Sequence, residues 1–234
     1  MEREPVNYAT FAFKVYEREK ELNPQPEHDL NHYLMRIVSA IGRASSADDS
    51  GVAGPKIDYQ AFNEDIIGPD GFCYSYKKHI KGSLQDKFAE VAIRIFVLMG
   101  ARGIKVSMFD NMNMNIAPMQ HHVSSYYKTL NELLYELVST ITHRKEQDYT
   151  TLELLRVYEK NPEDKELDKL INEQFGEIEF PEDIELRTVY GFQNYMVTMP
   201  LMTILSVLSS WFKSQGGRDM AWHINARMYY KSNL

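Results

Sequence analysis

The segment from Ser83 to Ile104 constrains the fold more than any other part of the chain. Its apolar side chains recur at spacings of three and four residues, the period that places them on one face of an α-helix. That face comprises Leu84, Phe88, Val91, Ala92, Ile95, Leu98 and Met99. Ser83 is expected to cap the start of the helix, and Gly100 and Gly103 to end it. The segment is therefore predicted to be a core helix, and its N-terminal half also carries charged side chains.

The same period elsewhere predicts an all-α protein, a single domain over residues 1–234 built on a four-helix bundle. The other core helices are expected at 29–48, 129–143 and 198–212, and a last helix is expected at 219–230. Asp29 is the expected N-cap of the first of these, and Pro200 is expected in the first turn of the 198–212 helix.

Shorter segments connect the predicted core helices. Residues 1–25 are expected to form an N-terminal arm or short helix that ends at the NPQP sequence. Residues 56–71 are expected to be irregular or weakly helical, and the Met- and Asn-rich stretch 108–119 to be a partly buried linker.

Residues 148–187 are predicted to be an acidic helical insertion of two helices. Its first helix has an apolar stripe of Leu152, Leu155 and Tyr158, and Asn161 is the expected N-cap of the second. Residues 159–185 contain eleven acids and three lysines, whereas the whole chain has a net charge of −7. Such a run is usually a solvated helix face. A docking surface for a basic partner protein is the alternative.

Residues 30–41 and 130–141 are similar to each other over twelve positions without a gap. The sequences LNHYLMRIVSAI and LNELLYELVSTI share Leu, Asn, Leu, Val, Ser and Ile, and each is followed by a loop and a long apolar helix. Helical patterning explains the apolar matches but not the shared Leu-Asn and Val-Ser pairs. A tandem duplication of a helical hairpin is the interpretation we favour, because two such hairpins make a four-helix bundle.

Composition excludes several classes of partner. No basic stripe is present, so duplex nucleic acid is not expected to bind. The apolar run 195–212 contains Pro200 and is short for a bilayer, so a buried core helix rather than a membrane span is expected. The charged N-terminus is unlike a signal peptide, and the single cysteine, Cys73, suits a reducing compartment. A protein of the cytoplasm, or of another reducing and soluble compartment, is therefore expected.

Two other groups of residues could suggest a functional site, but we expect each of them to have a structural role. His121 and His122 are adjacent and have no acid or cysteine at ligand spacing, so they are expected to be exposed loop residues rather than a metal pair. Arg94 lies four residues after Glu90, and we expect the two side chains to form an ion pair.

Three segments carry a resemblance to a known family. They are Leu34 to Asp49, Lys81 to Ile104, and the closing sequence WHINARMYYK from Trp222 to Lys231. In order and in sequence they resemble the MazG-like and dimeric-dUTPase-like all-α nucleoside triphosphate pyrophosphatases. The closing segment is the most specific, because that family commonly ends with a helix of the form His-Ile-Glu-x-Lys-Met-x-Tyr-Asn.

The resemblance implies a mechanism that depends on four carboxylates. The family places a Glu-x-x-Glu pair on one helix and a Glu-x-x-Asp pair on the next, and each pair shares a helix face. The four groups hold Mg²⁺, which orients a triphosphate and activates the water that cuts between its α and β phosphates. Lys, Tyr and Asn of the closing helix hold the nucleotide.

Carried over by position, the first pair falls on Ala40 and Arg43 and the second on Lys87 and Glu90. Only one carboxylate remains, so we expect a non-catalytic protein with no catalytic residue, no cofactor and a binding or assembly role. The resemblance assigns substrate binding, and with it weak nucleotide binding, to Arg227, Tyr230 and Lys231. The alternative is an active Mg²⁺-dependent pyrophosphohydrolase whose metal is held by Glu90 and Asp86. The oligomeric state stays open between a monomeric pseudo-dimer, a homo-oligomer and a pairing with a related chain.

Overall fold

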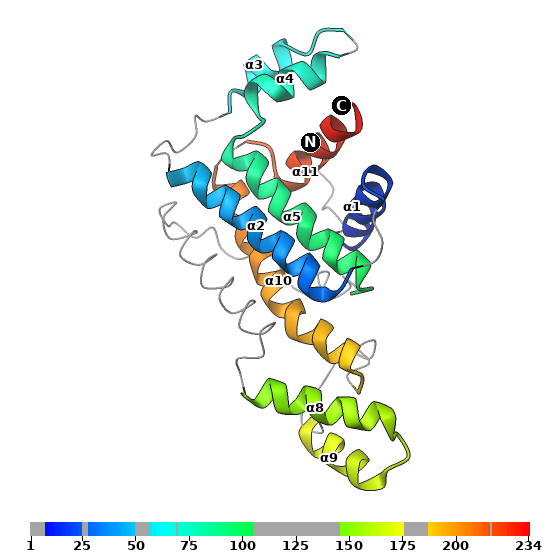
Figure 1. The fold of residues 1–234 in the computed structure, drawn as a ribbon. Coiled ribbons are helices and arrows are strands. Elements are labelled where there is room, and N and C mark those ends of the chain that lie inside the picture. Colours follow the sequence, from blue (N-terminus) through cyan, green and yellow to red (C-terminus); the bar gives the residue numbers. More distant parts are fainter. Residues whose placement is uncertain are drawn as a thin grey trace. The chain divides into compact units, whose positions relative to one another are not determined.

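All regular elements in the described part of the chain are α-helices, so the predicted all-α class is confirmed (Figure 1). The computed structural model describes residues 8–24, 28–49, 57–68, 70–104, 146–175, 187–215 and 217–234. Their helices are α1 (Tyr8–Leu22), α2 (Leu30–Asp49), α3 (Tyr59–Glu64), α4 (Gly71–His79), α5 (Leu84–Ala101), α8 (Glu146–Lys160), α9 (Lys165–Phe175), α10 (Val189–Ser214) and α11 (Met220–Ser232). A four-helix-bundle core stays a prediction.

Residue contacts divide the chain into two compact units. One comprises Met1–Leu130 with Ile204–Leu234, and the other comprises Asn131–Thr203. The first contains α1 to α5, the C-terminal part of α10, and α11, whereas the second contains α8, α9 and the N-terminal part of α10. The second copy of the proposed repeat, the helix at 129–143, the 108–119 linker and the histidine pair all lie outside the described residues.

Helix α5 is the centre of the first unit, and it packs against α1, α2 and α11 (Figure 1). The Ser83 hydroxyl accepts a hydrogen bond from the Asp86 amide at 3.2 Å, which confirms the predicted N-cap. All seven residues of the predicted apolar face are buried. At the other end Gly103 has a φ of +61°, and the Ile104 amide bonds back to the Met99 carbonyl at 2.9 Å. This is the left-handed cap that glycine favours.

Gly100 lies inside α5, so its predicted role as a stop is wrong. A Cβ atom placed there would be 2.6 Å from Cβ of Tyr16 and 2.8 Å from its Cδ1. Those separations are well inside van der Waals contact. The absence of a side chain at Gly100 therefore lets α1 pack closely on α5. Helix α1 lies within residues 1–25, which were predicted to form an N-terminal arm or short helix.

Helices α3 and α4 contribute a second hydrophobic cluster to this unit. Sequence alone predicted irregular or weakly helical chain over 56–71, which contains α3, and it predicted no helix at the position of α4. The buried residues of this cluster are Ile57, Phe62, Tyr76, Ile80, Ala226 and Tyr230. The Ser75 hydroxyl ties the two helices together by donating to the Phe62 carbonyl at 2.6 Å. Each helix is short, and its stability comes from aromatic packing against α11 rather than from a long apolar period.

The acidic segment contains two packed helices, as predicted. Leu152 and Leu155 of α8 are buried with Ile171 of α9. The Asp164 carboxylate accepts from the Glu166 amide at 2.9 Å and so occupies the capping position of α9. Asn161 instead ends α8 through its amide, which bonds to the Tyr158 carbonyl at 3.0 Å, so the prediction of Asn161 as N-cap is wrong.

Helix α10 runs from Val189 to Ser214, and Pro200 lies in its interior rather than in its first turn. The helix begins nine residues before residue 198, the start predicted from the sequence, so that prediction is wrong. By length and composition alone α10 passes the test for a membrane span, and 71% of its most apolar window is buried.

Candidate functional site

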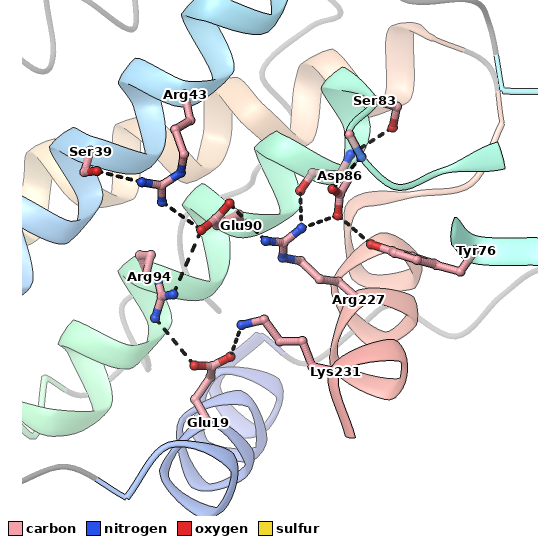
Figure 2. A network of polar contacts seen from close by, with 11 residues as sticks. Glu19, Ser39, Arg43, Tyr76, Ser83, Asp86, Glu90, Arg94, Arg227 and Lys231 are labelled. Carbon is pink, nitrogen blue, oxygen red and sulfur yellow. Dashed lines mark hydrogen bonds and ion pairs between the residues drawn. The ribbon is translucent and has the colours of Figure 1, made fainter. Parts of the chain in front are cut away.

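Seven charged side chains from four helices form one network in the first unit (Figure 2). The carboxylates are Glu19 of α1 and Asp86 and Glu90 of α5. The cations are Arg43 of α2, Arg94 of α5, and Arg227 and Lys231 of α11. The network therefore holds three carboxylates and four cations, and it lies where the family resemblance expects a metal site.

Asp86 is the most deeply buried acid of the network, since its side chain is 2% exposed. It accepts hydrogen bonds from the Tyr76 hydroxyl at 2.5 Å and from the Gly82 amide at 2.9 Å. Its charge is balanced by Arg227, whose Nη1 atom contacts the same carboxylate. Burial alone would raise the pKa of Asp86, but Arg227 and the two neutral donors outweigh it and hold the pKa below its usual value.

Glu90 lies one helical turn after Asp86 and is held by three guanidinium groups. Arg227 approaches it at 2.9 Å and Arg43 at 2.8 Å, whereas Arg94 lies at 4.0 Å, the limit of an ion pair. Burial raises the pKa of Glu90, and the opposing effect of these cations, led by Arg227, leaves the pKa below normal. The expected pairing of Arg94 with Glu90 is confirmed. Two further arginines hold Glu90 more closely: Arg43, which the family positions placed near it, and Arg227, which sequence had assigned to substrate binding.

Glu19 connects α1 to the rest of the network. Its side chain is 4% exposed, and it pairs with Lys231 at 2.6 Å and with Arg94 at 3.5 Å. Burial lowers the pKa of Lys231, and the charge of Glu19 counteracts this in part. Arg94 therefore bridges two carboxylates, and α1 is fastened to both α5 and α11 by buried ion pairs.

The three residues assigned to substrate binding lie on α11 but do not share one open surface. Arg227 points to Asp86 and Glu90, and Lys231 points to Glu19 (Figure 2). Tyr230 is 6% exposed and stacks on Tyr76 with ring centroids 4.7 Å apart. All three side chains are therefore occupied by contacts within the protein.

Glu19 and Tyr76 were not identified as site residues from the sequence, although the sequence pattern around Glu19 could have indicated it. Glu19 continues the buried stripe of α1, because Ala12, Val15 and Glu19 follow each other at spacings of three and four and all are buried. An acid on such a stripe predicts a buried ion pair. Tyr76 left no comparable signal, since its helix was not expected.

Asp86 and Glu90 converge on one cation. The spacing of four places the two carboxylates on neighbouring turns, and both contact Arg227. Within the described ranges no group of three or more His, Cys, Asp or Glu side chains is arranged to hold a metal ion. Ala40, which stands for one family carboxylate, is 1% exposed and belongs to the apolar core.

Comparison of the chain with models of protein families, with curated proteins and with solved structures finds no match. The functional interpretation consequently depends on the geometry of the network and on the resemblance of its motifs.

Proposed function

We propose that this chain is a non-catalytic relative of the all-α nucleoside triphosphate pyrophosphatases and works as a binding or assembly protein. The observation that supports it is that each acid of α5 is already paired with arginine: Arg227 contacts both Asp86 and Glu90, and Arg43 contacts Glu90. Oxygen atoms that a divalent cation would need are thereby used by guanidinium groups.

Electrostatics favours this interpretation over a hidden metal site. At about 4 Å and an effective dielectric constant of about 20, each guanidinium would repel a doubly charged ion by about 8 kcal/mol. Magnesium binding would thus require Arg227 to leave the two carboxylates. Arg227 exposes 14% of its side chain, and pairing with Asp86 and Glu90 raises its pKa despite burial, so it stays charged.

The alternative is an active Mg²⁺-dependent pyrophosphohydrolase that cleaves a nucleoside triphosphate to a monophosphate and pyrophosphate. One observation favours it: Asp86 and Glu90 converge on a single group, so a cation bound in place of Arg227 would meet two carboxylates. Substrate phosphates would then supply the remaining ligands.

A turnover assay decides between the two functions. Pyrophosphate release is measured for the eight common nucleoside triphosphates with and without Mg²⁺, and the proposal expects none. Release that depends on Mg²⁺ and disappears in Glu90→Gln would establish the alternative instead.

A second experiment tests the positional assignment by rebuilding the acidic lining. The triple variant Ala40→Glu, Arg43→Glu and Lys87→Glu restores the family pattern around Glu90, and we expect it to gain Mg²⁺ affinity in calorimetric titration. Arg43→Gln is the matched control, because it removes a cation without adding an acid. A folded triple variant, checked by circular dichroism, that binds no more Mg²⁺ than this control would contradict the assignment.

An assembly role has its own candidate surface in the second unit. Helices α8 and α9 carry exposed acids, and their ion pairs, such as Lys169 with Glu173 at 3.7 Å, are exposed and weak. A basic partner protein at this surface, a homo-oligomer and a pairing with a related chain remain predictions.

A further inference from the structure

A groove of about 780 Å³ lies in the first unit, on the side of α11 that does not carry the ion network. Helix α11 forms its floor from Trp222 to Ser232, a length of about 15 Å at a rise of about 1.5 Å per residue. Helix α1 forms one wall, and Phe72 of α4 lines the opposite side. The volume is within the range of small-molecule sites, about 300–1,000 Å³.

The two walls differ in chemistry. The α1 wall supplies the groove's cations, Lys14 and Arg18, and none of the residues that line the groove in the described structure is acidic. Lys14 is exposed and makes no ion pair with any residue that the structure describes. Arg18 pairs with Glu21 at 3.0 Å, but both side chains are at least half exposed, so this pair is weak. In a chain of net charge −7, such a lining selects an anion.

The floor and the α4 wall are aromatic. Tyr229 is 50% exposed, and its ring meets Phe72 edge to face with centroids 4.8 Å apart. Trp222 is held in turn by Phe62, at 5.6 Å, and Tyr59, at 5.9 Å. These rings are fixed by their neighbours and keep part of their surface open, which is the arrangement that stacks planar ligands.

A hydrogen bond between the two groove-lining helices favours a compact ligand over a docked helix. Arg18 Nε donates to the Ser232 hydroxyl at 3.2 Å and joins the C-terminal parts of α1 and α11. A bound helix of three turns is about 16 Å long and needs a groove open at both ends. Because this hydrogen bond crosses from one groove-lining helix to the other, a compact molecule fits the groove better than a helix does.

We propose that this groove binds a nucleoside phosphate, with its base against Phe72, Trp222 and Tyr229 and its phosphate at Lys14 and Arg18. The inference deepens the binding role proposed above and rests on it, but it assigns the ligand to a different surface of α11. Arg227 and Lys231 are occupied by Asp86 and Glu19, whereas the groove offers Lys14, which has no ion pair among the described residues, the exposed and weakly paired Arg18, and open aromatic surface.

Calorimetric titration of the full chain with the four ribonucleoside monophosphates, in EDTA so that no metal-dependent turnover occurs, tests the proposal. Adenosine and inorganic phosphate are titrated separately, and each is expected to bind at least about tenfold more weakly than AMP because it fills only half the groove. Decanoate, an aliphatic anion, is expected to bind no better than phosphate.

Two variants and two matched controls locate the site. Tyr229→Ala is expected to weaken binding by about 5- to 150-fold through the loss of one stacking surface, and Lys14→Gln by about three- to tenfold. Tyr74→Ala and Lys77→Gln remove an exposed aromatic and an exposed cation of α4 outside the groove, and both are expected to bind like the wild type. Circular dichroism checks that each variant is folded.

The outcomes separate this proposal from the previous one. Absence of binding at roughly millimolar monophosphate, or binding unaffected by both groove variants, overturns it. Binding that Lys231→Gln weakens and Lys14→Gln does not would return the ligand to the network and overturn the groove. Decanoate binding as tightly as AMP would show an acyl site. Turnover of triphosphates with Mg²⁺ would defeat the non-catalytic proposal without altering these titrations.

Discussion

Replacement of Arg227 by Met is expected to be among the most damaging single changes in the network. Methionine keeps the length of the side chain and favours the helix, so the main loss is the charge. Asp86, at 2% exposure, would keep its hydrogen bonds from Tyr76 and Gly82 but would have no cation in contact. Removing one partner of a buried ion pair typically costs about 3–5 kcal/mol. In a chain of this size that lowers Tm by about 6–20 °C.

Arg43→Met is the matched control for this prediction. Arg43 exposes 45% of its side chain, and Glu90 retains Arg227 and Arg94 after its removal. The expected cost is about 0–1 kcal/mol, the range for an exposed pair. Urea denaturation followed by circular dichroism measures both variants, and an Arg227→Met cost no larger than that of Arg43→Met would refute the reasoning.

The pH dependence of the stability lost in Arg227→Met gives a second test of the same prediction. In the wild type Asp86 has a lowered pKa, so its contribution to stability is present above its unfolded value and is lost as the pH falls through the folded value. Without Arg227, burial raises the pKa of Asp86, and protonation then relieves the buried charge. The stability gap between variant and wild type should therefore be widest near neutral pH and shrink on acidification. Asp86→Asn combined with Arg227→Met should recover part of the loss.

Two other predictions concern the fold. Gly100→Ala should destabilise the protein by about 1–3 kcal/mol in urea denaturation, because the added Cβ would overlap Tyr16. Gly42→Ala is the control: a Cβ there would meet no atom within 4 Å, so the variant should be stabilised by up to about 1 kcal/mol. Equal effects of the two substitutions would contradict the packing explanation. Burial lowers the pKa of His223 from 6.5 to about 4. Between these pH values the imidazole is protonated in the unfolded chain but not in the folded protein, so the free energy of unfolding should fall by about 3 kcal/mol as the pH drops from 6.5 to 4. His223→Gln should flatten that part of the stability profile, and an unchanged slope would show that another group titrates there.

Periodicity was sufficient for the long helices of the first unit because their apolar faces are buried against neighbours. The stripe of α5 and its cap at Ser83 are examples, and so is Asp29, whose carboxylate accepts from the His32 amide at 2.8 Å. The same reasoning failed for α3 and α4, since helices of six and nine residues are too short to show a period. It also started α10 too late, because the uncharged sequence extends upstream as far as Thr188.

The site was less accessible to sequence reasoning than the helices. Sequence reasoning correctly indicated that Arg43 and Arg94 lie near Glu90: the family's helix pairing placed Arg43 there, and the spacing of four residues placed Arg94 there. It gave no reason to expect that Arg227 is fixed by two acids, because partner choice depends on how α11 packs across α5. A closing-helix cation that looks available for a phosphate in sequence is thus an internal counter-charge in the structure.

Helix α11 links the two proposed functions through its contact with α1. Lys231 pairs with Glu19 on one side, and the next residue, Ser232, accepts a hydrogen bond from Arg18; both Ser232 and Arg18 line the groove. A ligand that changes the distance between α1 and α11 at the groove would therefore act on the Glu19–Lys231 pair, and by reciprocity the state of that pair would alter groove affinity. Glu19→Gln supplies the test: coupled sites require that it change monophosphate affinity although Glu19 does not line the groove. An unchanged affinity in a folded Glu19→Gln variant would mean that network and groove are independent, and that the ion pairs serve stability alone.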